Sequence, residues 1–599
     1  MITKESGFIR AFCILALICL SMGSVLSAGE LKTFSKEITG TQEEYVIEVN
    51  GTLDPENVEI TIENLGETAV VDPRMTVNNL YDWYDVNSMV KEITAGSTTD
   101  EEKALAIWEW VHWKRFQRSP LDHSSLHPVR AMNGYGYGIC GHTAAWLKCL
   151  WTAAGLQARV QEIWGHTITE AYYNGAWHML DGNVKVFYTA RDNRTIASLA
   201  ELEKDAWLIK RTIHPRDPWI RQNDPPGRNE EFVRYIITSD DNFEEHSYDS
   251  EIAKNYTMSY TLKPGEKLIR WWNPVLEKYE SCDKQPQVPQ RYANGRLVWE
   301  PDLGKVDVRD YLNVIENITT RQRDGQEPAI HLARLQDENY SRPSRFTIPV
   351  NSAYPIVGGR FWCKLRKDSG ASAGISYGEP DWEQSDLYTY RWGAGTEEVE
   401  LYLDKFILDS APRYNYEIGF TLKGNANPRK PAQAGVEWFK SFTDLQVSPH
   451  SLPALKRGRN VIRYWDSSQG ARKVRITHTW REIDDNHTPG KVTQAISPAN
   501  AEEVKVLTPL FKWSPAKDED TNDKVVDYQV MVSLRSDCRW PLSMSLYRNS
   551  GSPACEWKVS ESFLNPGTTY YWKVRARDSH GAVGEWGDIF SFKTSDKAK

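Results

Sequence analysis

A cysteine, a histidine and an aspartate between residues 140 and 181 could together perform nucleophilic chemistry. Cys140 follows the glycine- and tyrosine-rich stretch GYGYGI and precedes an apolar run that ends before Gly155. The run is typical of a helix with a glycine cap, which places Cys140 at the helix start. The free N–H groups and the dipole there favour a thiolate over a thiol. The alternative is a small buried apolar residue, which is the commoner role for a cysteine considered alone.

The histidine and the aspartate lie in the stretch GHTITEAYYNGAWHMLDGN, residues 165–183. Its Asn174-Gly175 pair is a strong signal for a two-residue hairpin turn of type I′. The pairing that this turn imposes makes His166 and Asp181 diagonal neighbours on one face of the hairpin, within reach of a hydrogen bond. His178 has the opposite parity and is expected to point the other way. A core or surface position remains the alternative for His166 considered alone.

These three residues form the pattern of a nucleophilic triad, in which a carboxylate fixes the imidazole tautomer and the imidazole activates the thiol. The elements that must position them are a helix starting at residue 140 and the two strands of the hairpin. A further helix is expected just upstream, because residues 98–100 can cap a run with Ala104, Ile107, Trp108 and Val111 on one face.

Residues from about 95 to 190 resemble a transglutaminase-like domain of the papain-like cysteine-enzyme class. The motifs are GICGHTAAWLKCLWTAAGLQARV, then HTITE, then GAWHMLD with its acid 15 residues after the histidine. The resemblance implies Cys140 as nucleophile, His166 as base and Asp181 as orienting acid. It also implies a papain-like α+β core. Substrate contacts are expected from Tyr135, Tyr137 and His142, which lie near the nucleophile in the sequence.

Three classes of function are compatible with these residues. The first is a thiol enzyme that acts on an amide bond, as a peptidase, deamidase, transamidase or glycan-asparagine amidase. The second is a carbohydrate-active enzyme, such as a polysaccharide lyase that uses the same cleft to abstract a proton from a uronic acid. The third is a non-catalytic binding protein with a degenerate transglutaminase-like fold, against which the complete triad argues. No cofactor is expected for any of them.

The first 28 residues have the layout of a signal peptide: Lys4 and Arg10, an apolar run at 11–20, then small residues. We therefore expect a secreted, periplasmic or cell-surface protein with no membrane span after cleavage, because no later apolar run is long enough. Its formal net charge of -9 argues against nucleic acid as the main partner. The expected substrate is an extracellular protein, glycoprotein or polysaccharide.

The 599 residues exceed what one core accommodates, and the pattern indicates several domains. We expect an N-terminal β region at 29–95, a catalytic domain at 96–248, a β-sandwich region at 249–488 and a module at 489–599. The last segment resembles a fibronectin type III module, in its LTPLFKWSPA and YYWKVRARDSHG motifs. The fold class is thus a multidomain combination of α+β and all-β units, with β-sandwich domains flanking the papain-like core. Because the triad lies wholly upstream, we expect the last module to be removable.

Metal sites and disulfides are less clearly indicated. The histidines of HSSLH, residues 123–127, have the spacing of metal ligands but no supporting ligand nearby. The acidic segment KDEDTNDK, residues 517–524, has a composition that could bind calcium, but we expect a solvated loop, and hence no metal site. Pairing of Cys538 with Cys555 and of Cys282 with Cys363 is possible in an exported chain.

Overall fold

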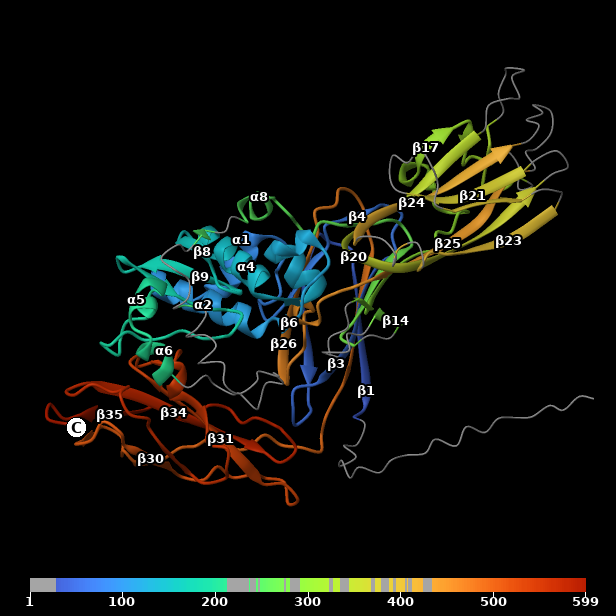
Figure 1. Cartoon of the computed structure of the whole chain (residues 1–599). Coiled ribbons are helices and arrows are strands. Elements are labelled where there is room, and N and C mark those ends of the chain that lie inside the picture. Colours follow the sequence, from blue (N-terminus) through green and yellow to red (C-terminus); the bar gives the residue numbers. More distant parts are fainter. Residues whose placement is uncertain are drawn as a thin grey trace, which may run out of the picture.

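The computed structural model describes residues 29–212, 248–273, 291–322, 327–333, 344–367, 395–404, 412–423 and 434–599, with short strand segments at 244–245, 276–280, 372–378 and 387–391 and single residues at 236 and 407. The signal peptide expected at 1–28 lies outside these residues. Within them the protein is mostly β and divides into a helical unit, a long β body and a C-terminal module (Figure 1).

The largest sheet runs the length of the β body in the order β1-β27-β3-β13-β16-β25-β20-β24-β21-β22. Its strands are β1 (Leu31–Ile38), β3 (Glu56–Asn64), β13 (Glu266–Trp271), β16 (Gly295–Trp299), β20 (Ser344–Lys367), β21 (Ser372–Gly378), β22 (Leu387–Arg391), β24 (Arg413–Lys423), β25 (Gly435–Leu445) and β27 (Val474–Arg481). Further strands join it at β17 (Asn313–Glu316), β18 (Ile318–Thr319), β19 (Ile330–Leu332) and β23 (Gly395–Tyr402).

The N-terminal strands pair with strands from the far end of the β body. Strand β1 lies antiparallel to β27, and β3 lies between β27 and β13. A second sheet joins β2 (Gln42–Val49), β26 (Gly458–Trp465) and β5 (Arg74–Val77). The segments expected as separate units at 29–95 and 249–488 therefore share sheets. Alternation of apolar residues predicts each strand, but it carries no information on a partner so distant in the sequence.

The outer part of the β body extends away from the helices. In Figure 1 the long strands β20 and β25 reach from the centre of the molecule to its upper right, where β23 and β24 flank them. Short pairs complete the body: β4 (Val70–Val71) with β12 (Thr261–Leu262), and β14 (Leu276–Glu280) with β15 (Arg291–Ala293).

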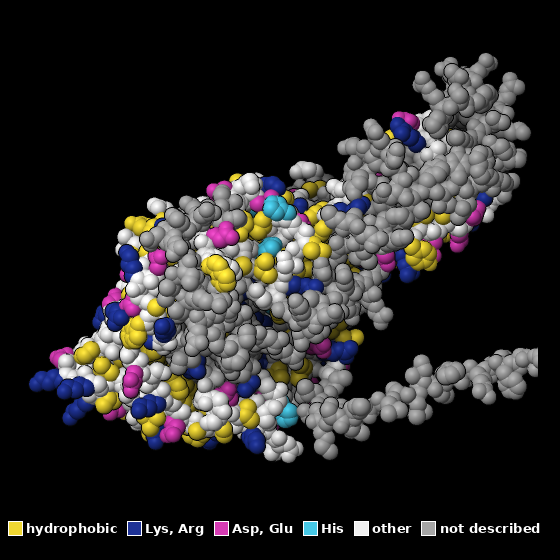
Figure 2. Space-filling model, viewed as in Figure 1, with side chains coloured by type: hydrophobic (Ala, Val, Ile, Leu, Met, Phe, Trp, Pro, Cys, Tyr) yellow, Lys and Arg dark blue, Asp and Glu magenta, His cyan; other side chains and the backbone are white. Residues whose placement is uncertain are grey.

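On the face shown in Figure 2, acidic and basic side chains are interspersed over the described surface.

The helical unit packs three main helices against a small antiparallel sheet. The sheet has the order β10-β9-β8-β11. The helices are α1 (Val86–Ile93), α2 (Asp100–Trp113), α3 (Pro128–Arg130), α4 (Cys140–Ala153), α5 (Leu199–Lys204), α6 (Trp207–Arg211) and α8 (Asp249–Ile252), and the strands are β6 (Phe116–Gln117), β7 (Tyr137–Gly138), β8 (Gln157–Ile163), β9 (His166–Tyr173), β10 (Ala176–Met179) and β11 (Glu244–Glu245). Helix α2 begins at a reciprocal capping box of Thr99 and Glu102, close to the cap expected from the sequence.

The C-terminal module consists of two facing sheets around its own core. One contains β28 (Ala495–Ser497), β30 (Leu510–Trp513) and β33 (Glu556–Lys558); the other contains β29 (Glu502–Val504), β31 (Val525–Ser533), β32 (Tyr547–Asn549), β34 (Thr569–Asp578) and β35 (Phe590–Thr594). Trp513 and Trp572 are buried at its centre. The module lies below the helical unit in Figure 1 and contacts it: the indole of Trp540 donates to Glu109 at 2.9 Å, and Arg535 pairs with Glu102.

The cysteines of the described residues are free thiols. Cys363 and Cys538 are buried, and Cys555 is half-buried. The proposed Cys538–Cys555 disulfide is therefore not formed in this structure, and Cys282, the possible partner of Cys363, lies outside the described residues. Across those same residues, no helix has both the length and the apolar character needed to span a bilayer.

Candidate active site

Cys140 is the first residue of helix α4. The preceding residue, Ile139, has extended backbone geometry and its side chain caps no N–H group. The N–H groups of the first turn therefore remain available near the thiol, as the sequence predicts. The helix is held by buried indoles: Trp146 donates to the carbonyl of Ser125 at 2.7 Å, and Trp151 to that of Ala104 at 3.1 Å.

The hairpin of β9 and β10 has the register expected from Asn174-Gly175. Tyr173 pairs with Ala176 and Ala171 with His178, and both turn residues have positive φ, 50° and 82°. Regular pairing ends at Met179, two residues before Asp181. The position of Asp181 relative to His166 therefore depends on the loop that follows β10.

His166 and Asp181 are hydrogen bonded, with 2.7 Å between Nε2 of the imidazole and Oδ2 of the carboxylate. The other carboxylate oxygen, Oδ1, accepts the backbone N–H groups of Asn183 and Val184 at 2.7 and 2.8 Å. The indole of Trp108 donates to the Asp181 carbonyl at 2.9 Å. Asp181 is only 1% exposed, and these hydrogen bonds fix both its carboxylate and its backbone carbonyl in position.

The pKa values of the thiol and the imidazole move toward an ion pair. Burial alone would raise the pKa of Cys140, but the hydrogen bond and charge of His166, with the N–H groups of Thr167 and Gly141, outweigh it and hold the pKa below its ordinary 9.0. Burial likewise opposes the charge on His166, but Asp181 and Cys140 outweigh it and raise the imidazole pKa to about 9. Cys140 and His166 thus favour the thiolate–imidazolium state.

His178 lies on the other face of the hairpin, as the register predicts. Its ring nitrogens contact backbone carbonyls, Nδ1 that of Ile196 at 2.6 Å and Nε2 that of Tyr173 at 3.1 Å. The ring also stacks on Tyr173, with 3.8 Å between centroids. His178 therefore connects the hairpin to the following loop and has no contact with Asp181.

Two of the three expected substrate contacts are buried against the β body. Tyr135 donates to Asp122 at 2.7 Å, and the hydroxyl of Tyr137 accepts from Gln446 at 3.1 Å. Both rings cluster with Tyr292 of β15. Since neither ring faces solvent, the prediction that they contact substrate gains no support from their placement. Their rings instead anchor the loop before Cys140 to the β body.

His142 occupies the first turn of α4 and is half-buried. Its ring meets Trp146 edge to face, and burial lowers its pKa to about 4. The imidazole is therefore neutral at physiological pH. The histidines of HSSLH, which were not expected to form a metal site, differ in exposure: His123 is largely exposed, whereas His127 is buried and its Nδ1 accepts the N–H of Val129.

Three features of the site have no clear signal in the sequence. The first is Arg115, which is 4% exposed and donates to the carbonyl of Gly138 at 3.1 Å and to that of Gly182 at 3.1 Å, with a further short bond to the carbonyl of Asn183. It thereby joins the backbone just before Cys140 to the backbone just after Asp181. An arginine so far upstream has no spacing that predicts this contact.

The second feature is Tyr248, whose hydroxyl lies against the start of α4. A Cβ atom at Gly141 would come within 2.5 Å of that oxygen, so a larger residue at 141 would have to displace the tyrosine hydroxyl. Burial raises the pKa of Tyr248, and the negative charge of Cys140 raises it further. The tyrosine belongs to a segment far downstream in the chain, next to α8.

The third feature is Trp164, at the turn between β8 and β9. Its side chain is 58% exposed although it lies two residues before His166. The nearby Glu170 of HTITE is, by contrast, fully buried: it pairs with Arg159 and accepts the N–H of Leu199 at the start of α5. Glu170 is therefore part of the support of the sheet.

Two models of known domain families match parts of this chain. Residues 87–182 match the model of the transglutaminase-like superfamily. Residues 497–595 match the model of the Rha78A-like N-terminal immunoglobulin domain, so the C-terminal module is immunoglobulin-like, and that match does not extend to the fibronectin type III assignment. No curated protein matches the chain.

Several solved structures show a weak likeness. An α-L-rhamnosidase from Dictyoglumus thermophilum is 21% identical over 18% of this chain and 12% of its own, with a TM-score of 0.15. The Endo-D glycoside hydrolase domain from Streptococcus pneumoniae R6 is 12% identical over 49% of this chain and 37% of its own, with a TM-score of 0.12. Red sea bream transglutaminase is 9% identical over 85% of this chain and 70% of its own, with a TM-score of 0.15. This chain thus spans about an eighth of the rhamnosidase and about a third of Endo-D, and such low scores identify no reaction.

Proposed function

We propose that the protein is an exported thiol enzyme of papain-like design. It cleaves an amide bond and transfers the acyl group either to water or to an acceptor amine. The observation that carries the proposal is the hydrogen bond between His166 and Asp181, made beside a cysteine at an uncapped helix start. This arrangement provides a nucleophile, a base and an orienting acid in one place. The match of residues 87–182 to the transglutaminase-like superfamily supports it.

In this mechanism the Cys140 thiolate attacks the carbonyl carbon of the amide, and the carbonyl oxygen becomes an oxyanion. The free N–H groups at the start of α4 stabilise that charge. The His166 imidazolium then gives its proton to the departing amine as the carbon–nitrogen bond breaks, which leaves a thioester on Cys140. Neutral His166 next removes a proton from water or an acceptor amine, whose attack releases the acyl group and restores the thiolate.

The substrate class that we propose is an extracellular protein, glycoprotein or polysaccharide-linked amide. The exposed Trp164 supports an extended substrate, because it presents apolar ring surface in the turn two residues before His166, on which a sugar or a side chain can stack. The half-buried His142 borders the same helix start and is a neutral hydrogen-bonding group there. Replacement of Trp164 by alanine is expected to raise KM more than it lowers kcat, as measured by steady-state kinetics.

The test is turnover of amide substrates by the wild type and by Cys140→Ala. Glutaminyl peptides and glycopeptides would be incubated with and without a primary amine, and ammonia release, amine incorporation and peptide cleavage would be followed by mass spectrometry. We expect Cys140→Ala to lose activity while Cys555→Ala, which changes a half-buried thiol in another domain, keeps it.

Retention of full activity by Cys140→Ala would refute the thiol mechanism. In that case a uronic-acid polymer should be assayed for the unsaturated product of a lyase. Absence of turnover on all these substrates, with Cys140 alkylated no faster than a free thiol, would favour the non-catalytic binding protein.

A further inference from the structure

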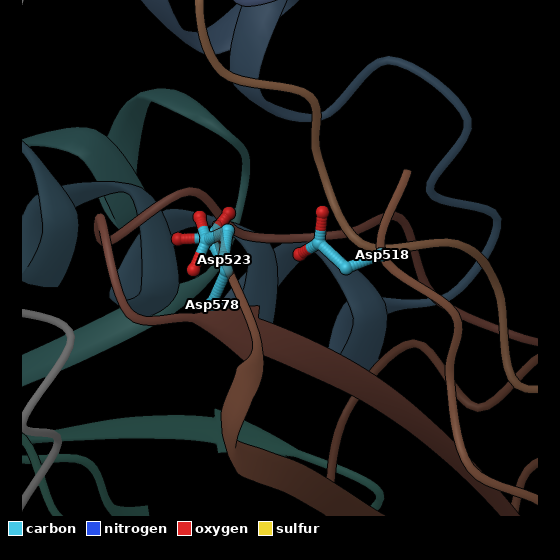
Figure 3. Close-up of side chains that lie close together, drawn as sticks. All are labelled: Asp518, Asp523 and Asp578. Atoms are coloured by element: carbon cyan, nitrogen blue, oxygen red, sulfur yellow. The ribbon is translucent and has the colours of Figure 1, made fainter. Parts of the chain in front are cut away.

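A group of carboxylates gathers in the immunoglobulin-like domain, away from the triad. Asp518 and Asp523 belong to the loop between β30 and β31, and Asp578 is the last residue of β34. One oxygen of each lies within 4.8 Å of the others. In Figure 3 the carboxylate of Asp518 points toward those of Asp523 and Asp578.

Two of these carboxylates carry an oxygen without a hydrogen-bond donor among the described residues. Asp578 is 1% exposed; its Oδ1 accepts the N–H of Ala582 at 2.8 Å, but its Oδ2 is buried and has no donor. Asp518 accepts the N–H of Asp520 through Oδ1 at 3.0 Å, and its Oδ2 is likewise buried and without a donor. A buried carboxylate oxygen left unsatisfied costs free energy, and two near each other also repel.

The basic groups nearby are directed at other oxygens. His580 contacts Oδ2 of Asp523 at 2.5 Å, and His487 contacts Oδ1 of Asp520 at 2.8 Å. Lys517 and Lys524 are exposed. Among the described residues, no basic side chain therefore reaches the open Oδ2 atoms of Asp518 and Asp578.

We propose that Asp518, Asp523 and Asp578 bind a divalent cation of the calcium type. Calcium takes hard oxygen ligands at about 2.3–2.6 Å, so oxygens on opposite sides of one ion are separated by about 5 Å, which the observed spacing allows. The ion would give the open Oδ2 atoms of Asp518 and Asp578 a partner. The sequence alone favours a solvated loop here, because Asp578 comes from a different strand and the loop by itself lacks the buried ligand.

Such an ion would stabilise the connection between the immunoglobulin-like domain and the rest of the chain. It would link the loop that carries Asp518 and Asp523 to the end of β34. The same loop already holds the linker that follows β27: Oδ2 of Asp520 accepts the N–H of His487 at 2.6 Å, and the carbonyl of Lys517 accepts that of Gly490 at 2.8 Å. The site therefore lies where the domain joins the β body, and its role is structural.

The experiment is calcium titration of the full chain, first freed of metal by a chelator. Calorimetry would measure binding, and thermal unfolding would be recorded with chelator, with calcium and with magnesium. We expect saturable calcium binding at one site and a calcium-dependent rise in the unfolding midpoint, because a ligand of the native state stabilises it. Absence of both in the wild type would overturn the proposal without any variant.

Variants then locate the site. The double change Asp518→Asn and Asp578→Asn should weaken calcium binding by at least tenfold and abolish the rise in the midpoint. Its folding is checked by circular dichroism in chelator, where loss of the repulsion favours the native state. Asp588→Asn, which changes an exposed aspartate of the same domain outside the cluster, should bind calcium as the wild type does. Unchanged calcium binding by the double variant would refute the assignment.

Discussion

At the scale of single residues, Cys140 and Cys149 show how position on one helix decides the chemistry of a thiol. Cys149 is buried on the opposite side of α4, and burial raises its pKa to about 12. Cys140 has the same side chain at the helix start, where His166 and backbone N–H groups lower its pKa. Both positions follow from the sequence, because nine residues amount to half a turn out of phase.

This contrast predicts selective alkylation. Iodoacetamide reacts with thiolates, so its rate at Cys140 should reach a plateau at a pH below the ordinary thiol pKa of 9.0, while Cys149 stays protected. As pH falls through the pKa of Cys140 the thiolate takes up a proton, and the rate should fall with it. Peptide mapping by mass spectrometry across a pH series measures both. Equal and slow labelling of the two cysteines would exclude an activated thiol.

The catalytic rate should depend on pH in a bell shape. The acidic limb follows protonation of Cys140, and the basic limb follows loss of the proton from His166, whose pKa of about 9 lies well above its ordinary 6.5. In Asp181→Asn the imidazolium loses its counter-charge, so the basic limb should move to lower pH. Profiles of kcat/KM for both proteins test this, and an unchanged basic limb in the variant would show that another group controls it.

The two histidines of the hairpin should differ sharply in mutants. His166→Ala removes the base and should lower kcat on the order of a thousandfold or more. His178→Ala leaves the triad in place and should affect mainly stability, since its contacts are with backbone carbonyls. Steady-state kinetics and thermal unfolding distinguish the two effects. An inactive His178→Ala beside an active His166→Ala would refute the assignment of the base.

At the scale of elements, local signals predict the hairpin and the helix start but not what holds them together. Asn174-Gly175 sets the register because its backbone conformation admits only one pairing. The position of Asp181 beyond the regular ladder depends on Arg115 and on the turn at 181–184, which are tertiary contacts. The burial of Tyr135 and Tyr137 has the same origin, because both rings cluster with Tyr292 of the β body.

Arg115 is therefore predicted to be a positioning residue. Arg115→Lys keeps the charge but cannot bond the carbonyls of Gly138 and Gly182 at once, so kcat should fall by roughly a hundredfold with little change in KM, as misplacement of catalytic groups by about 1 Å does. Arg118→Lys, three residues away, is the control. Kinetics and the alkylation rate of Cys140 give the readout. A loss confined to thermal stability would show that Arg115 supports the fold alone.

At the scale of the whole molecule, the immunoglobulin-like domain is docked on the helical unit. Trp540 is 3% exposed and packs in the same core as the helices of the helical unit. Arg211 of α6 also donates to the carbonyl of Ser562 at 2.8 Å. The sequence does not predict these contacts. Its motifs are equally compatible with a module that does not contact the helical unit.

Truncation after residue 488 should therefore retain the chemistry but weaken the fold. The triad has no described contact with the module, so the alkylation rate of Cys140 should persist, whereas removal of Trp540 from its site exposes apolar surface worth about 2 kcal/mol. Trp540→Ala in the full chain should reproduce part of the fall in the unfolding midpoint. If the truncated chain is folded but its Cys140 is unreactive, the module contributes to the site.

The pairing of β1 with β27 has a consequence for the order of events during synthesis. Strand β1 leaves the ribosome long before residues 474–481 are synthesised. The edge of β1 that pairs with β27 therefore remains unpaired while most of the chain is still being made. An unpaired strand invites aggregation, and β1 carries Lys32, Lys36 and Glu37 among its exposed or half-exposed positions, which disfavour that outcome. Closure of the β body is thus a late event in folding, which can follow only when nearly all of its strands have been made.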